Sequence, residues 1–321
     1  MTKKYRNKEI EYEKKGQFDR DLNEEHRTAD ARDIGGGYRY LTKTPGERLR
    51  RFFLIPAVRV FGTIYTFFAY GFRVKGRKNL RAVKGGAVSV CNHVHEMDTL
   101  MVKLALGGFR SYHTGSFYLL KRGWAGRIFK AGGFLPVGTT VKDLENLQTT
   151  VGSLLQRGKI VNFYPEHALW YRYEKVRPFK IGAFRFAVKF GVPVLPMFIE
   201  FRQTRLRRLF RMQKKVILHI LPAVQPEEGG SLKAKAQALS DRVRAAMVQK
   251  YEEVYQKKMT FLTEASAEEE EAERDAGHTR EEKRERAAAS KPWAAQEQTP
   301  SAPAADEAEE QTEGAEAAAT A

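Results

Sequence analysis

Short apolar runs alternate with stretches of helical periodicity through the middle of the chain, over residues 79–262. Apolar runs bounded by Gly, Pro or polar residues are typical of buried strands. Apolar residues spaced three and four apart between these runs are typical of amphipathic helices. The alternation predicts one α/β sandwich domain with a mixed or parallel central sheet flanked by helices.

The predicted strands lie at residues 87–91, 111–117, 134–137, 160–164, 192–200 and 216–221. The predicted helices lie at residues 98–106, 123–130, 141–157, 180–190 and 231–255. The helix at 141–157 has the clearest pattern. Its expected buried face consists of Leu144, Leu147, Val151, Leu154 and Leu155.

A mainly apolar segment precedes this domain at residues 52–72 and has basic residues on both sides. Its length would permit a membrane span. Arg59 near its middle and Pro56 argue against a straight spanning helix. We therefore expect residues 46–78 to form an amphipathic helical segment that associates with the membrane surface. A core helix of a soluble domain is the alternative.

The two ends of the chain differ from the domain in composition. Residues 1–45 form a charged N-terminal extension without the apolar core of a secretion signal, so we expect the protein on the cytoplasmic side. Residues 263–321 are rich in Ala and Glu and poor in large apolar side chains. Such a composition cannot bury enough surface to offset the entropy of ordering, so it predicts a disordered tail.

The negative charge of the tail partly offsets a strong positive charge in the rest of the chain. The chain has 56 basic and 39 acidic residues, of which 50 and 22 fall in residues 1–263, a formal net charge of +28. This charge favours anionic lipid surfaces, phosphorylated substrates or nucleic acid. The sequence lacks nucleic-acid-binding motifs, so we expect no nucleic-acid partner. The one cysteine, Cys91, falls in an apolar strand and is expected to be buried rather than nucleophilic.

Candidate chemistry follows the first strand of the domain, in the segment Asn92-His93-Val94-His95-Glu96-Met97-Asp98. A neutral imidazole can accept a proton near pH 7, and a carboxylate on its other ring nitrogen stabilises the imidazolium that forms. His93 and Asp98 thus have the spacing of a pair that activates a hydroxyl group. A helix-capping aspartate beside a polar loop histidine is the alternative.

Three further motifs follow in order: Gly132-Gly133-Phe134-Leu135-Pro136-Val137, then Tyr164-Pro165-Glu166, then Val192-Pro193-Val194-Leu195-Pro196-Met197. Together with the first motif, this series resembles the glycerolipid acyltransferase family, the lysophosphatidic-acid-type enzymes. The family's blocks run Asn-His-x4-Asp, Gly-x-x-Phe-Ile, Phe-Pro-Glu-Gly and Val-Pro-Val-x-Pro. The resemblance covers about residues 50–225.

The resemblance implies an O-acyltransferase that moves a fatty acyl group from acyl-CoA or acyl carrier protein to a lysophospholipid hydroxyl. It implies catalytic roles for His93 as general base and Asp98 as its orienting partner, with no metal and no cofactor. Membrane lipids are the implied partners, and the expected location is the cytoplasmic face of the membrane, as a peripheral or monotopic protein. The candidate substrate-binding residues are Asn92, Gly133, Glu166, Arg172, Arg177 and Lys180.

Two of the blocks depart from the family pattern. The third usually continues Gly-Thr-Arg, whereas Glu166 is followed by His167. The second usually ends in an arginine, where this chain has Val137-Gly138-Thr139. An inactive lipid-binding protein is therefore one alternative. A metal-dependent hydrolase is another, because His93, His95 and Asp98 loosely resemble a binuclear metal motif with altered spacing.

Overall fold

The computed structural model describes residues 3–22, 38–41, 44–117, 120 and 124–262, which hold a seven-stranded sheet in the order β1-β7-β6-β2-β5-β3-β4. The strands are β1 (Arg73–Lys75), β2 (Ala87–Cys91), β3 (Ser111–Ser116), β4 (Phe134–Val137), β5 (Ile160–Phe163), β6 (Val194–Arg202) and β7 (Lys215–Ile220). The β6–β7 pair is antiparallel and the other neighbouring pairs are parallel. The predicted mixed α/β sheet is confirmed.

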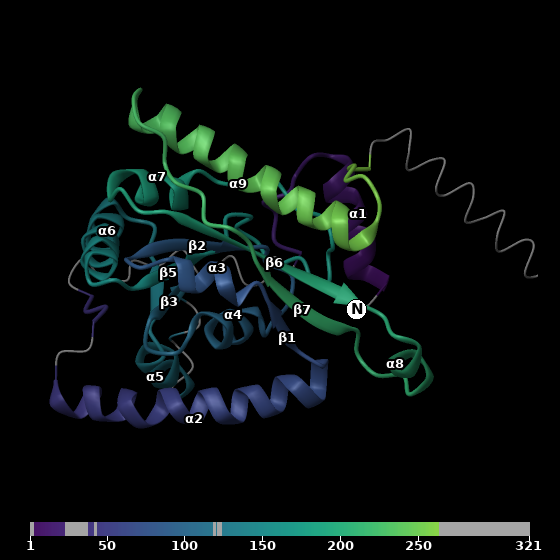
Figure 1. Cartoon of the computed structure of the whole chain (residues 1–321), viewed down its shortest axis with the longest axis horizontal. Helices are drawn as coiled ribbons and strands as arrows, with labels where there is room; N and C mark the ends of the chain where they lie inside the picture. Colours follow the sequence, from purple (N-terminus) through teal and green to yellow (C-terminus); the bar gives the residue numbers. More distant parts are fainter. Residues whose placement is uncertain (1–2, 23–37, 42–43, 118–119, 121–123, 263–321) are drawn as a thin grey trace, which may run out of the picture. The chain divides into compact units, whose positions relative to one another are not determined.

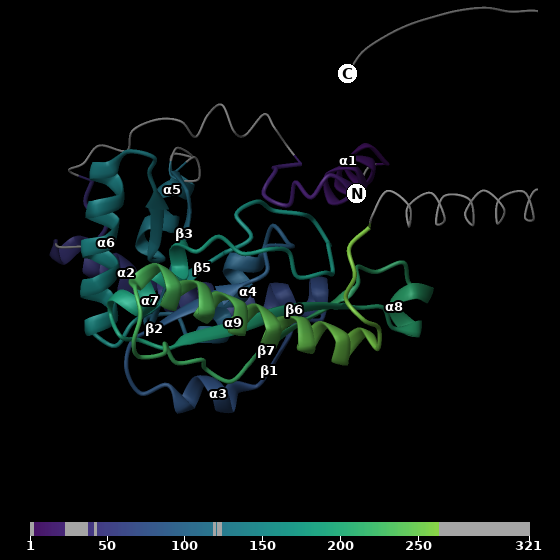
Figure 2. The ribbon, with the colours of Figure 1, turned by 90° about the horizontal axis from the view of Figure 1, so that it is seen from above.

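Helices precede and connect the strands (Figure 1). They are α1 (Lys3–Lys14), α2 (Pro45–Tyr70), α3 (Arg77–Ala82), α4 (Asp98–Leu106), α5 (Trp124–Ala131), α6 (Val141–Gln156), α7 (Gly182–Lys189), α8 (Arg205–Leu209) and α9 (Leu232–Tyr255). Figure 2 shows α9 crossing over the strands. The predicted helices at 98–106, 123–130, 141–157, 180–190 and 231–255 each correspond to one of these, within two residues at either end.

The sheet separates two apolar cores. Ala87 and Cys91 of β2 contribute to the core that also contains buried residues of α4. Val88 and Val90, which alternate with them, belong to the core formed with α6, α7 and α9. All five residues of β2 are buried, because helices cover both faces of a largely parallel sheet.

Helix α2 packs against α4 and α5 and begins with a capping box between Thr44 and Glu47. It ends at Gly71, whose φ of 55° turns the chain into β1. A side chain at Gly71 would also meet the Arg207 guanidinium. By length and composition, α2 is the one helix in the described part of the chain that could span a membrane, with a mean hydropathy of 1.6.

The structure differs from the sequence-based expectations in several places. Four short or peripheral elements were not predicted: α1, β1, α3 and α8. Residues 73–75, grouped by the prediction with the membrane-associating segment, pair with β7. Leu144, expected in the core, is 47% exposed, whereas Leu147, Val151, Leu154 and Leu155 of the same predicted face are buried. The predicted tail at 263–321 lies outside the described residues.

Candidate active site

The candidate catalytic residues lie at the carboxyl end of β2, a central strand between β5 and β6. His93 is in the loop that leaves β2, and Asp98 is the first residue of α4. The carboxyl ends of parallel strands are where α/β proteins usually bind ligands. The strand-loop-helix order predicted for this motif is therefore correct, and it brings both residues to a suitable edge.

His93 and Asp98 are in direct contact. The distance between His93 Nδ1 and Asp98 Oδ2 is 2.5 Å, and the Asp98 side chain is only 1% exposed. An ionised carboxylate accepts a hydrogen bond from a protonated Nδ1. In a neutral imidazole with its proton on Nδ1, the other ring nitrogen, Nε2, is unprotonated. The His93 side chain is 23% exposed. The geometry is that of a general base with its orienting carboxylate.

Tyr164 and Thr99 complete the surroundings of the imidazole. The ring of Tyr164 stacks on that of His93 with centroids 4.2 Å apart, and its hydroxyl lies 3.2 Å from Thr99 Oγ1. Burial, and then the charge of Asp98, raises the pKa of Tyr164 well above its usual range, so the phenol stays protonated. Neither residue was a candidate from the sequence, although Tyr164 opens the third motif block.

Glu166 and Arg177 form a buried ion pair under the His93 loop. Arg177 Nη2 lies 2.8 Å from Glu166 Oε2, and both side chains are fully buried. The same carboxylate oxygen accepts the backbone N–H of His93 at 3.2 Å. Arg177 Nη2 also donates to the carbonyl oxygens of His93 and Ala168. The pair thus holds the His93 loop in position.

These contacts revise the expectation that Glu166 and Arg177 bind substrate directly. Their polar atoms are engaged by the protein, because Arg177 also donates from Nη1 to the Phe18 carbonyl and stacks over Trp170. Substrate contact would require breaking a buried ion pair, which costs several kcal/mol. The geometry makes Glu166 and Arg177 positioning residues.

The structure also places Asn92 and Gly133, two further candidates for substrate binding. The Asn92 amide is buried and exchanges two hydrogen bonds with the backbone of Ile199 on β6, at 2.8 and 3.2 Å. Gly133 precedes β4, at the amino end of its parallel pairing with β3, whereas His93 follows the carboxyl end of β2. The structure therefore contradicts direct binding by Gly133 at the His93 site. The Asn92 amide instead ties β2 to β6.

The two remaining candidate cations have different surroundings. Lys180 is exposed and pairs with Asp19 at 2.7 Å. Arg172 donates its backbone N–H to the Val94 carbonyl at 2.7 Å, and its guanidinium lies over the Tyr171 ring. No Asp or Glu of the described residues forms an ion pair with Arg172. Of the cations predicted to bind substrate, Arg172 is the one beside the catalytic loop with its charge unpaired.

His95 and Cys91 are structural neighbours of the site. His95 Nδ1 accepts the Met97 N–H, and the ring packs edge-on against Tyr70 at the end of α2. Burial lowers the pKa of His95, so this ring is neutral at pH 7. Cys91 is fully buried, as expected, and burial raises its pKa. Within the described ranges, no group of three or more His, Cys, Asp or Glu side chains could hold a metal ion.

Comparison with known proteins identifies the domain. The model of the acyltransferase family matches residues 71–200. The fold is similar to the crystal structure of the 1-acyl-sn-glycerophosphate (LPA) acyltransferase PlsC from Thermotoga maritima, with a TM-score of 0.50 and 20% sequence identity. That similarity covers 69% of this chain and 87% of PlsC. A search of curated proteins gave no significant match.

The matched residues extend from the end of α2 to β6 and so contain His93, Asp98, Tyr164, Glu166 and Arg177. The resemblance inferred from the four motif blocks is thereby confirmed for residues 71–200, which match the acyltransferase family model.

Proposed function

We propose that the protein transfers a fatty acyl group from acyl-CoA or acyl carrier protein to the free hydroxyl of a lysophospholipid such as 1-acyl-glycerol-3-phosphate. The observation that carries this proposal is the contact between His93 Nδ1 and the buried carboxylate of Asp98, 2.5 Å apart at the carboxyl end of β2. An imidazole oriented in this way can deprotonate an alcohol.

In the proposed reaction, His93 Nε2 takes the proton of the acceptor hydroxyl as its oxygen attacks the thioester carbonyl of the donor. Asp98 stabilises the imidazolium that forms. The tetrahedral intermediate collapses when the carbon–sulfur bond breaks, and the leaving thiolate takes the proton from the imidazolium. The products are the ester and a free thiol. No acyl-enzyme is required, so both substrates must be held together in the site.

Arg172 is our candidate for binding the acceptor phosphate. It lies beside the catalytic loop, because its backbone bonds to Val94, the residue after His93. Its guanidinium is close enough to His95 to lower the pKa of that ring. An unpaired guanidinium suits bidentate binding of phosphate. Arg172 would then substitute for the arginines that the second and third motif blocks lack.

We propose that the enzyme binds the cytoplasmic membrane surface through α2. The buried residues of α2 are Arg51, Ile55, Gly62 and Thr66, and most of its aromatic side chains are exposed. A Cβ at Gly62 would lie 3.1 Å from the Leu100 side chain on α4, the helix that begins at Asp98. A lipid surface in contact with α2 would therefore lie close to the helix that carries the catalytic carboxylate.

The test is thiol release by the purified protein supplied with an acyl-CoA and lysophosphatidic acid in mixed micelles, with the lipid product identified by mass spectrometry. We expect His93→Ala to lower the rate by about 100-fold or more, the usual contribution of a general base. Arg185→Ala, an exposed change on α7, is the control and should keep the full rate.

Acyl carrier protein in place of acyl-CoA in the same assay identifies the donor. A rate unchanged by His93→Ala would disprove the proposed mechanism. The panel of acceptors should include some with a phosphate group and some without. Lipid binding without thiol release over the whole panel would instead favour the inactive lipid-binding alternative.

A further inference from the structure

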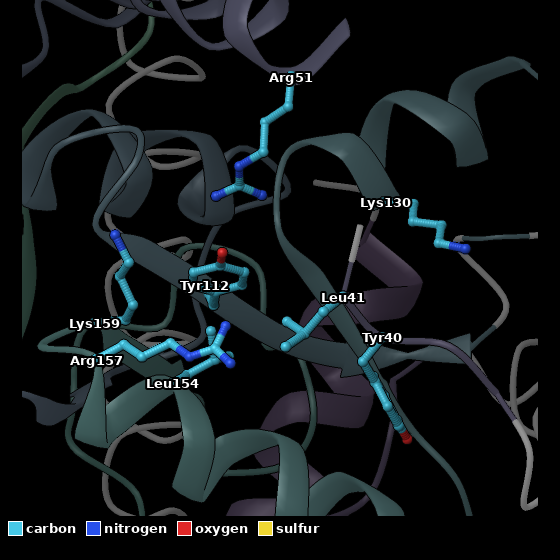
Figure 3. Close-up of a pocket in the computed structure, with 8 residues that line it drawn as sticks. All are labelled: Tyr40, Leu41, Arg51, Tyr112, Lys130, Leu154, Arg157 and Lys159. Carbon is cyan, nitrogen blue, oxygen red and sulfur yellow. The ribbon is translucent and has the colours of Figure 1, made fainter. Parts of the chain in front are cut away.

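Figure 3 shows a basic pocket of about 90 Å³. It lies at the amino ends of β3 and β5, whereas His93 follows the carboxyl end of β2. It is formed where α2, β3 and the end of α6 meet, and none of the described residues that line it is an Asp or Glu. Its lining consists of Tyr40, Leu41, Arg51, Tyr112, Lys130, Leu154, Arg157 and Lys159. A pocket of this size has room for a group with the bulk of about three water molecules, such as a phosphate.

Arg51 is the central observation. It is 9% exposed, and its guanidinium lies over the Tyr112 ring, 4.7 Å from the ring centroid. Nη1 donates to the Ala131 carbonyl, but the buried Nη2 has no hydrogen-bond partner among the described residues. A buried charged donor left without a partner is costly, so this nitrogen needs an acceptor.

Arg157 and Lys159 supply further positive charge from one side of the pocket (Figure 3). Neither side chain forms an ion pair or hydrogen bond with a described residue. Lys130 is directed instead toward the ring of Tyr38, 5.4 Å from its centroid. Of the four cations that line the pocket, Arg51, Arg157 and Lys159 are therefore the candidates for binding a ligand, and none of these three is paired with a described carboxylate.

A cation near a helix C-terminus can simply donate hydrogen bonds to backbone carbonyl groups, and Arg110 does so. Its guanidinium donates to the carbonyl oxygens of Val83, Gly85 and Gly158 at the same end of the sheet. Arg157 and Lys159 make no such bonds. Capping hydrogen bonds of the kind that Arg110 makes therefore do not account for the other two cations.

The charge of Arg51 also affects neighbouring buried groups. Burial, and then the charge of Arg51, lowers the pKa of Lys103 to about 7. A side chain at Gly133 would come within 3.2 Å of Arg51 Nη1, so the glycine makes room for the guanidinium. An anion in the pocket would offset this concentration of positive charge.

We propose that this pocket is a second anion site, which binds a phosphate group through Arg51, Arg157 and Lys159. Two guanidinium groups and an ammonium match the charge and the acceptor oxygens of a phosphate monoester or diester. The site is separate from the acceptor site at His93, because it lies at the amino ends of the strands. Arg51 belongs to α2, so the phosphate can come from a lipid headgroup or from solution.

The test is isothermal titration calorimetry of the full chain with three probes: inorganic phosphate, glycerol 3-phosphate, and dihexanoyl phosphatidic acid below its micellar concentration. We expect saturable binding that Arg157→Gln/Lys159→Gln weakens by about tenfold or more, since two charge-assisted contacts are lost. Arg51→Gln should abolish it. The control is Arg185→Gln/Lys189→Gln on α7, with the same change of charge, which should stay within about twofold of wild type.

The probes separate the two phosphate sources. Binding of the lipid alone identifies a headgroup site, and binding of all three identifies a general phosphate site. Binding by wild type that the Arg157/Lys159 double variant retains in full would overturn the proposal, because the ligand would then occupy another site. Absence of saturable binding by every probe would also overturn it. The result is independent of thiol release, so it stands or falls separately from the proposed reaction.

Discussion

At the scale of single residues, the site depends on how each polar group around His93 is partnered. Its Nδ1 is held by Asp98, its backbone N–H by Glu166, and its carbonyl by Trp170 and Arg177. These contacts fix the ring from one side, and in the proposed reaction Nε2 is the nitrogen that meets the acceptor hydroxyl. The catalytic loop therefore has little freedom to move, and a small change in one partner should be visible in the rate.

Asp98→Asn tests the orienting role of the carboxylate. The amide keeps the shape of the side chain but loses the charge that stabilises the imidazolium, so we expect kcat to fall by about 100-fold or more with KM nearly unchanged. Thiol-release kinetics measure both values, and the melting temperature confirms folding. A variant with the wild-type kcat would disprove the orienting role of Asp98.

Arg172 is the proposed binding residue for the acceptor phosphate, and Lys180 is its matched control. Arg172 has no carboxylate partner in the described residues, whereas Lys180 pairs with Asp19 at the surface. Arg172→Gln should raise KM for lysophosphatidic acid by about tenfold, the loss of one charge-assisted contact. It should leave the KM for an acceptor without a phosphate group unchanged. Lys180→Gln should change neither value, and an equal effect of the two variants would contradict the assignment.

At the scale of elements, periodicity predicted the regular helices and strands and missed those that depend on tertiary contacts. The helix at residues 98–106 and the strand at 87–91 were predicted with their observed bounds, because their apolar residues are nearly continuous. Strand β1 has three residues and helix α8 five, too few for a periodic pattern. The charged sequence of α1 gave no signal of its own.

The candidate site was predicted in the same uneven way. His93 and Asp98 are close in sequence, so their spacing on a strand-loop-helix unit was sufficient to find them. The partnership of Glu166 with Arg177 spans a long loop and depends on the buried surroundings of both side chains. Sequence reasoning selected the right residues there but assigned them to substrate, because a charge in a sequence does not reveal whether it is exposed.

The N-terminal segment that includes α1 packs on the loop that supports the catalytic residues, and it contains an unfavourable carboxyl group. Burial, and then the charge of Glu13, raises the pKa of Glu9 to about 7. The folded state thus binds more protons than the unfolded state between about pH 4.5 and 7, so stability falls as the pH rises through this window. Above it, Glu9 is ionised in both states and the full penalty remains.

Glu9→Gln should therefore raise the melting temperature at pH 8 and have a much smaller effect at pH 5. The stabilisation is at most about 3 kcal/mol at pH 8, from the size of the pKa shift. Scanning calorimetry at both pH values measures it. Glu11→Gln is the control on the same helix, since it removes only the exposed pair with Lys15 and should leave the melting temperature nearly unchanged at both pH values. Equal shifts at pH 5 and 8 would contradict the assignment.

At the scale of the whole described domain, the two faces of the sheet are covered differently. Helices α6, α7 and α9 cover one face with amphipathic packing. On the other, α2 lies outside α4 and α5 and exposes Phe52, Phe53, Phe61 and Phe68, each by more than 60%. Arg207 of α8 bonds to the Ala69 carbonyl, which brings a second exposed apolar and basic segment to the end of α2. Such a surface is typical of membrane contact.

Phe61→Ser/Phe68→Ser tests whether this face binds lipid. Burying a phenylalanine contributes about 1.5 to 3 kcal/mol, so the double variant should bind vesicles at least about tenfold more weakly. Sedimentation with vesicles of mixed anionic and zwitterionic lipid measures the partition. Leu144→Ser/Leu232→Ser, two exposed leucines on α6 and α9, is the control and should bind as wild type does.

Salt and alkaline washing distinguish a helix on the membrane surface from one that spans it. The basic residues should make binding to anionic vesicles fall as the salt concentration rises, because exposed charges are screened over about 10 Å at 0.1 M. Carbonate washing should release a protein held by one exposed face of α2. A protein that resists carbonate would instead require α2 to separate from α4 and α5, since the buried Arg51, Ile55 and Gly62 would then face lipid. Retention after carbonate, or equal binding by the two double variants, would contradict the interfacial arrangement.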